Sequence, residues 1–223
     1  FADYSTRALQ NRVTPQQVLE ILREGNKRFH TGNRISRDFS RQIDGTAQGQ
    51  NPLAVVFSCI DSRVPAELVF DLGIGDIFSV RVAGNIIGTK SLGSIEYGVA
   101  VAGAKLVLVM GHTRCGAVTS SVQLMYDERS VEQASGCPHL YAIVREIQQS
   151  AGGDECRGVE LMSPDKKELC IDSVARKNVK RTVREIVARS HAIRQAVDAG
   201  RLLVIGAMYD VQSGFIEFFT DPT

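Results

Sequence analysis

The chain of 223 residues contains no tryptophan, and aromatic residues make up only 6% of it. It also has little net charge, because 26 Lys and Arg residues oppose 25 Asp and Glu residues. A net charge of +1 gives no long-range attraction to nucleic acids or to acidic membrane surfaces. No apolar run approaches the roughly 20 residues that a membrane-spanning helix needs. The composition therefore predicts neither a nucleic-acid-binding protein nor one that inserts into a membrane.

The first residues, FADYSTRALQNR, lack an apolar leader and an initiator methionine. They do not form an intact signal peptide, and a processed chain or a domain cut from a longer protein would both fit. Cysteine is scarce as well, since five residues at irregular spacing do not make a disulfide scaffold. We expect Cys137, Cys156 and Cys170 to be reduced thiols and the protein to be cytoplasmic.

The other two cysteines stand where apolar runs end in polar residues. Cys59 lies in VVFSCIDSR, and Cys115 lies in LVLVMGHTRCG, three residues after His112. Two thiolates and one imidazole form a ligand set that suits zinc. Three protein ligands leave a fourth position free, which is typical of a catalytic rather than a structural zinc ion. The pattern predicts one Zn²⁺ per chain.

Apolar runs alternate with helical patterns along most of the chain. This alternation predicts an α/β fold with a mostly parallel sheet, in which four parallel strands and a C-terminal antiparallel edge strand are flanked by helices. The strands are expected at 53–58, 77–83, 106–110, 202–208 and 215–219. The helices are expected at 14–30, 66–70, 91–102, 115–126, 173–189 and 190–200.

The whole chain, 1–223, is predicted to be a single domain with two peripheral segments. Residues 13–32 form an N-terminal helical arm, in which Thr14, Pro15 and Gln17 are a helix-start signal. Residues 33–52 are expected to be irregular, and 127–171 to be a variable excursion with one helix. Ligands of such sheets bind beyond the carboxyl ends of the strands, which is where Cys59 and His112 are predicted.

Asp61 lies two residues after Cys59, close enough to reach the same site. Arg63 can pair with it through two parallel hydrogen bonds, which would keep Asp61 ionised and aim one oxygen at a zinc-bound water. If Arg63 released it, Asp61 could become a fourth zinc ligand and close the site. Asp61 and Arg63 are therefore the predicted catalytic pair.

Other interpretations of these residues are open at this point. Cys59 could be a nucleophile activated by His112, although Cys115 and the Asp61-Ser62-Arg63 run would then have no role. Buried histidine and cysteine can also be ordinary core residues. The basic helix at 173–189 could be a nucleic-acid stripe, but no aromatic residues interleave its charges, so we expect a solvated face.

The segments SCIDSRVPAE, FSVRVAGN, GSIEYGV and MGHTRCGAV resemble the signatures of β-class carbonic anhydrases. The resemblance extends from about Val13 to the C-terminus. It implies a carbonate dehydratase, a lyase that reversibly hydrates carbon dioxide to bicarbonate and a proton by means of a zinc-bound hydroxide. It also implies Cys59, His112 and Cys115 as zinc ligands, and Asp61 and Arg63 as the catalytic dyad.

The resemblance further implies a narrow apolar substrate pocket at a subunit interface, with Phe78, Ala83 and Tyr97 at the matching positions. Gln50 matches a glutamine that binds substrate from the neighbouring chain. The family implies a homodimer or higher oligomer that exchanges N-terminal helices. Some bacterial members have an inhibitory bicarbonate site that uses a tryptophan, and Val56 stands at that position here.

The segment from Gly88 to Val118 also resembles carbonic anhydrase domains fused to SulP-type anion transporters, so the chain could be one module of such a protein. Two further functions stay open. One is a related hydrolase of carbonyl sulfide or carbon disulfide, and the other is a catalytically silent zinc-binding regulatory module. The intact Asp61 and Arg63 pair argues against the silent module, which would not need it.

Overall fold

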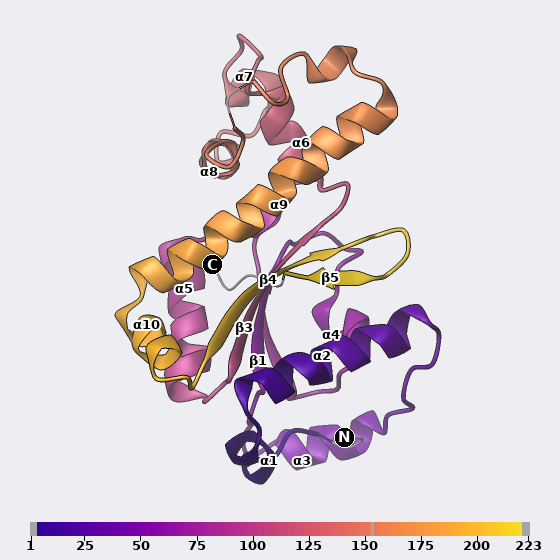
Figure 1. Ribbon diagram of the computed structural model, residues 1–223, viewed down its shortest axis with the longest axis vertical. Helices are drawn as coiled ribbons and strands as arrows, with labels where there is room; N and C mark the ends of the chain where they lie inside the picture. The colour runs from indigo at the N-terminus through magenta and orange to yellow at the C-terminus, as the bar shows by residue number, and fades with distance from the viewer. Residues whose placement is uncertain (1–3, 153, 220–223) are drawn as a thin grey trace.

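The computed structural model describes residues 4–152 and 154–219, and at its centre is a five-stranded sheet of order β2-β1-β3-β4-β5 (Figure 1). The first four strands in chain order pair in parallel, and the fifth is antiparallel to β4, so the predicted fold class is confirmed. The strands are β1 (Ala54–Ser58), β2 (Ile77–Arg81), β3 (Leu106–His112), β4 (Leu203–Tyr209) and β5 (Ile216–Phe218).

Helices cover both faces of the sheet, which is why β1 and β3 are buried along their whole length and apolar up to their polar last residues, Ser58 and His112. Alternate residues point to opposite faces: Val55 and Phe57 join one core cluster, and Ala54 and Val56 join the other. The helices that pack over the first cluster are α5 (Thr89–Glu96), α6 (Gly116–Gln123), α8 (Leu140–Gln148), α9 (Pro164–Arg189) and α10 (His191–Asp198). The second face is covered by α2 (Pro15–His30) and α4 (Ala66–Val69).

The predicted helix at 14–30 is confirmed as α2. Thr14 and Gln17 form a reciprocal capping box, and Pro15 occupies the first turn. Val18 and Leu22 are fully buried against the chain's own sheet. The inward face of α2 is therefore part of this chain's core, and an exchange of N-terminal helices between chains stays a prediction.

The expectation of an irregular segment at 33–52 is wrong, because α3 (Phe39–Thr46) lies within it. Asp38 begins this helix by accepting a hydrogen bond from the Arg41 N–H at 3.0 Å. Phe39 and Ile43 are the only large apolar residues of α3, and one such pair is too short an apolar stripe to mark the helix in the sequence. A second short helix, α1 (Arg7–Arg12), was not expected either.

The excursion at 127–171 holds more helix than the single one expected. It contains α7 (Val131–Ser135), α8 and the 3-10 turn η3 (Val159–Leu161), and α9 starts at Pro164 instead of residue 173. The first turns of α9 are mostly exposed and therefore lack an apolar stripe. The helix expected at 91–102 is α5 followed by the π-helical turn η2 (Tyr97–Val101), and the 3-10 turn η1 (Ala83–Asn85) follows β2.

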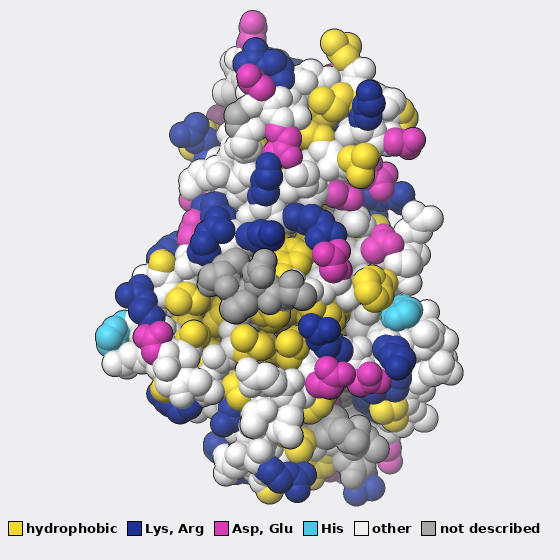
Figure 2. Space-filling view, viewed as in Figure 1, with side chains coloured by type: hydrophobic (Ala, Val, Ile, Leu, Met, Phe, Trp, Pro, Cys, Tyr) yellow, Lys and Arg dark blue, Asp and Glu magenta, His cyan; other side chains and the backbone are white. Residues whose placement is uncertain are grey.

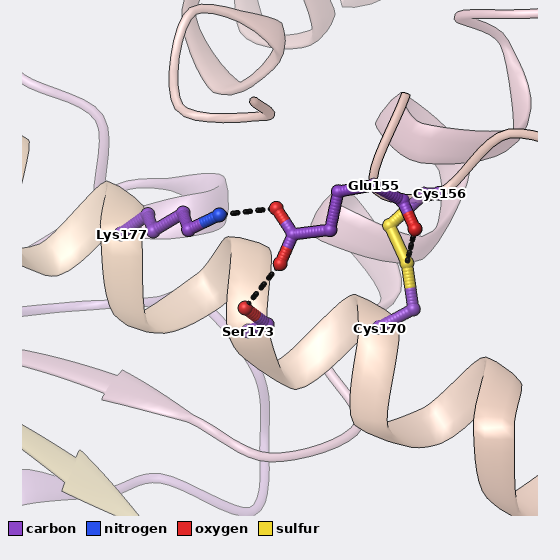
Figure 3. Close-up of a disulfide and its surroundings, with 5 residues drawn as sticks. All are labelled: Glu155, Cys156, Cys170, Ser173 and Lys177. Carbon is purple, nitrogen blue, oxygen red and sulfur yellow. Dashed lines mark hydrogen bonds and ion pairs between the residues drawn. A yellow bond between two sulfur atoms is a disulfide. The ribbon is translucent and has the colours of Figure 1, made fainter. Parts of the chain in front are cut away.

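Cys156 and Cys170 form a disulfide, so the expectation of reduced thiols is wrong for this pair (Figure 3). Both residues are buried, and their Cα atoms are 5.9 Å apart. Glu155 reinforces the connection, because it pairs with Lys177 and accepts a hydrogen bond from Ser173 at 2.6 Å. Cys137 is a free and exposed thiol, as expected.

The basic residues of α9 gather along its outer side (Figure 2). Arg176 pairs with Glu217, and Arg181 pairs with Glu146 and Glu185, so much of this charge is neutralised locally. In the part of the chain that the structure describes, no helix combines the length and apolarity needed to cross a membrane.

Gly25 of α2 should be essential to the packing of that helix, because a Cβ atom there would lie 1.9 Å from the Phe70 carbonyl oxygen. We expect Gly25→Ala to lower the free energy of unfolding by about 3 kcal/mol through overpacking. The matched control is Gly93→Ala within α5, where the added methyl group meets nothing within 4 Å. In that variant the free energy of unfolding should rise by about 0.5–1 kcal/mol. Urea unfolding checks both, and equal effects would contradict the close approach of α2 to Phe70.

Candidate metal centre and active site

Cys59, His112 and Cys115 converge at the carboxyl edge of the sheet, as predicted. Cys59 directly follows β1, His112 is the last residue of β3, and Cys115 immediately precedes α6. Since β1 and β3 are adjacent and parallel, their carboxyl ends lie side by side. The ligand atoms of the three residues all lie within 4.8 Å of one another, and the two Sγ atoms are 4.0 Å apart. All three residues are buried.

The imidazole of His112 is oriented for metal binding. Its Nδ1 lies 2.9 Å from the Thr113 carbonyl oxygen, which can only accept, so the proton must be on Nδ1. The lone pair of Nε2 then points toward the cysteines. Among the described residues, this buried Nε2 atom has no hydrogen-bond partner. An unpartnered buried nitrogen beside two sulfur atoms is what a metal ligand looks like before its ion is bound.

The two thiols cannot both ionise readily without a cation. A hydrogen bond from Cys115 lowers the pKa of Cys59, and the Gly84 N–H, 3.3 Å from its Sγ, also favours the thiolate. The same hydrogen bond, together with burial, raises the pKa of Cys115. A divalent cation between the sulfur atoms would stabilise both thiolates. The donor set therefore fits one zinc ion, with Cys59, His112 and Cys115 as its ligands.

Asp61 and Arg63 lie beside this donor set and hold each other. The Nε and Nη2 atoms of Arg63 donate to the two carboxylate oxygens of Asp61 at 2.9 and 2.8 Å, and the Arg63 backbone N–H donates at 2.9 Å. These bonds lower the pKa of Asp61 to about 2, chiefly through the Arg63 side chain. Asp61 Oδ2 is 3.9 Å from His112 Nε2, so the carboxylate faces the metal position while Arg63 engages both its oxygens.

Arg81 supports the site, although nothing in its sequence position pointed to it beyond its place in the segment FSVRVAGN. Its guanidinium donates to the Cys59 carbonyl oxygen at 2.9 Å and to the Asp61 carbonyl oxygen at 2.5 Å. It can do so because Arg81 pairs with Ser58 across the β1–β2 ladder. This register is a product of the fold, which is why the sequence alone did not reveal the role.

The predicted substrate-binding residues do not all lie near the metal ligands of their own chain. Ala83 does, since it opens η1, whose next residue contacts Cys59. Phe78, however, pairs with Val55, four residues before Cys59 on β1, which places it about 13 Å away along the strand. Tyr97 stacks on Phe78 with ring centroids 6.2 Å apart. Gln50 precedes β1 and so lies at that same far end of the sheet.

The comparison with known proteins identifies the family. A family model described as carbonic anhydrase matches residues 54–216. The chain belongs to the carbonic anhydrase family. It is 36% identical over 205 residues to carbonic anhydrase 2 of Mycobacterium tuberculosis (strain ATCC 25618 / H37Rv), with 91% of each chain covered. It is also 36% identical over 211 residues to a carbonic anhydrase of Mycolicibacterium smegmatis, covering 91% of this chain and 92% of that one.

Solved structures show that this family member has the fold of β-class carbonic anhydrases. A β-carbonic anhydrase of Aspergillus fumigatus superimposes with a TM-score of 0.68 at 22% identity, covering 92% of this chain and 90% of that one. One of two tetrameric β-carbonic anhydrases of Sordaria macrospora gives 0.67 at 23% identity, with 79% and 85% covered. The resemblance seen in the sequence is thereby confirmed, and a fusion to an anion transporter stays a prediction.

Replacing Cys115 with Ser should remove most of the zinc from the purified protein, because a neutral hydroxyl is a far poorer zinc ligand than a thiolate. Zinc per chain is measured by elemental analysis. Cys137→Ser is the control, since Cys137 is exposed and free, and it should keep the wild-type content of about one zinc. Full zinc occupancy in the Cys115→Ser protein would rule out Cys115 as a ligand.

Proposed function

We propose that this carbonic anhydrase reversibly hydrates carbon dioxide to bicarbonate and a proton, with one zinc ion held by Cys59, His112 and Cys115. The observation that carries the proposal is the buried, unpartnered His112 Nε2, which faces two sulfur atoms and a carboxylate already engaged by an arginine. The carbonic anhydrase family model supports the choice of substrate.

Zinc supplies a Lewis acid that makes water a nucleophile near neutral pH. Two thiolate ligands weaken that effect, so the site needs a group that orients the water. Asp61 is suited to this task, because Arg63 fixes its direction and lowers its pKa to about 2. At neutral pH Asp61 is then a pure hydrogen-bond acceptor. It holds the water in position and does not compete with buffer for the released proton.

The proposed pocket for carbon dioxide combines residues of two chains. Carbon dioxide is small and apolar, so holding it next to the nucleophile provides most of the benefit. Ala83 would line the pocket of its own chain. Phe78, Tyr97 and Gln50 lie at the far end of their own sheet, and we propose that they complete the pocket of a neighbouring chain.

We propose a homodimer or a higher oligomer for the same reason. The related proteins of Sordaria macrospora are described as tetrameric. Tyr97 and Val101 are 55% and 65% exposed in the single chain, and Phe39 and Ile43 of α3 are more than half exposed as well. Apolar side chains in such number suggest a surface that a second copy covers.

We also propose that the protein is cytoplasmic. The Cys156–Cys170 disulfide is then unusual, because disulfides are uncommon in the cytoplasm.

Asp61→Asn should keep its zinc but hydrate carbon dioxide about 10–100-fold more slowly, because the amide no longer holds the water as the carboxylate does. Stopped-flow hydration with zinc analysis on the same sample measures this. Asp127→Asn is a closely matched control, since Asp127 binds Arg129 through the same three hydrogen bonds on an exposed turn. Unchanged turnover in Asp61→Asn would remove Asp61 from the mechanism.

The wild-type protein in the same assay tests the function itself. Full zinc without hydration at any pH would contradict the proposal. Hydrolysis of carbonyl sulfide or carbon disulfide would then indicate the related hydrolase, and inactivity toward all three substrates would indicate a silent zinc-binding module.

Mixing two inactive or weakly active chains tests whether Gln50 acts across the interface. Gln50→Ala chains keep the zinc ligands, and Cys59→Ser chains keep Gln50. In a mixed dimer one complete site forms, so refolding an equal mixture should restore about a quarter of wild-type turnover. No gain over the separate samples would contradict a shared site.

A further inference from the structure

Arg114, which lies between two of the metal ligands, has an unusual backbone conformation. Its φ is +56°, in the left-handed region that residues with a side chain rarely occupy. Such a conformation persists only where neighbouring groups hold it. Here the Arg114 N–H donates to Asp172 Oδ1 at 3.0 Å, and its carbonyl oxygen accepts from Arg63 Nη2 at 3.2 Å. Arg114 therefore connects Asp172 to the partner of Asp61.

The side chain of Arg114 is held from the same helix. Its Nε donates to Glu168 at 2.9 Å, and its Nη2 donates to Gln212 at 3.1 Å. Glu168 and Asp172 are four residues apart on α9 and thus lie on one face of it. One short stretch of α9 fixes both the backbone and the guanidinium of Arg114, one of the two residues that separate His112 from Cys115.

This stretch of α9 is also where the helix leaves the core. Cys170 is the first buried residue of α9, and Leu169 just before it is 71% exposed. The disulfide to Cys156 attaches the helix at this point (Figure 3). Ser173 and Lys177, on the same side, bind the neighbouring Glu155. Cys170 thus lies between Glu168 and Asp172 in the sequence of α9, so the disulfide fixes the turn of the helix that carries both carboxylates holding Arg114.

We propose that Asp172 is a positioning residue for the metal centre, and that the Cys156–Cys170 disulfide keeps it in place, so that reducing the disulfide loosens the centre. The inference rests on the metal centre assigned under the proposed function. In the reduction, a dithiol gives two electrons and two protons to the S–S bond and closes to its own disulfide, leaving two protein thiols. The side-chain contacts of Glu155 with Ser173 and Lys177 contain no sulfur and survive, so the two thiols stay near enough for reoxidation to restore the disulfide, which is called the clamp below.

The positioning role is tested on the zinc-loaded protein by the rate at which a chelator removes zinc. Asp172→Ala should release zinc at least about tenfold faster than wild type. Asp172→Asn should be close to wild type, because its amide oxygen still accepts the Arg114 N–H. The visible spectrum of the cobalt-substituted protein should shift in Asp172→Ala alone, since it reports the geometry of the ligands.

Asp165→Ala is the matched control on the same helix. It removes an exposed acid of the first turn, with no contact to Arg114, and weakens the helix start alone. Its zinc release should be that of wild type. A wild-type rate in Asp172→Ala, or an equally fast rate in Asp172→Asn, would overturn the positioning role.

The clamp is tested on the wild-type chain, which avoids a variant that fails to fold. The disulfide is reduced with a phosphine, which becomes a phosphine oxide with oxygen from water, and the reagent is removed before the assay. Reduced wild type and Cys156→Ser should both release zinc roughly 2–30-fold faster than the oxidised protein. Cys137→Ser should respond to reduction as wild type does.

Equal rates in the oxidised and reduced proteins would overturn the clamp. Hydrogen exchange of residues 113–116 should rise on reduction, and unchanged protection there would speak against it as well. None of these measurements needs carbon dioxide. A protein that holds zinc but does not hydrate carbon dioxide would contradict the proposed function without affecting this test.

Discussion

The parallel pairing of β1 with β3 is the constraint on which the site depends. It aligns Ser58 with Met110. Cys59, the first residue after β1, therefore lies beside the end of β3, where His112 is the last residue. A shift of one residue would turn every side chain of β1 to the opposite face and bury Val55 and Phe57 in the wrong cluster. The register that builds the core is therefore the register that brings the metal ligands together, and the two cannot vary separately.

The strands, the metal ligands and the start of α2 could be predicted from the sequence, because each is marked by a pattern of neighbouring residues. Apolar runs that end in cysteine or histidine predicted both the strands and the ligands, and Thr14 with Gln17 predicted the start of α2. What the sequence did not reveal depends on contacts between distant segments. The pairing of Cys156 with Cys170 needs α9 to begin at Pro164, and its exposed first turns carry no apolar stripe. The roles of Arg81 and Asp172 likewise follow from where strands and helices come to lie.

The three metal ligands bring no positive charge of their own to the centre of the site. Two thiols 4.0 Å apart share a hydrogen bond, and the imidazole offers them a lone pair in place of a proton. Arginine residues surround this group from outside: Arg63 binds the carboxylate, and Arg81 binds the backbone of the same loop. The two arginine side chains thus hold the loop and the carboxylate in position without occupying the place where the ligands would bind zinc.

The Asp61–Arg63 pair spans only three residues, and the same hydrogen bonds recur between Asp127 and Arg129, which are not part of the metal-ligand cluster. Such a pair needs no sheet and no ion to form. The ligands, in contrast, meet only after two strands have aligned. A change elsewhere in the sheet that shifts β1 against β3 would therefore disperse the ligands and leave the Asp61–Arg63 pair intact.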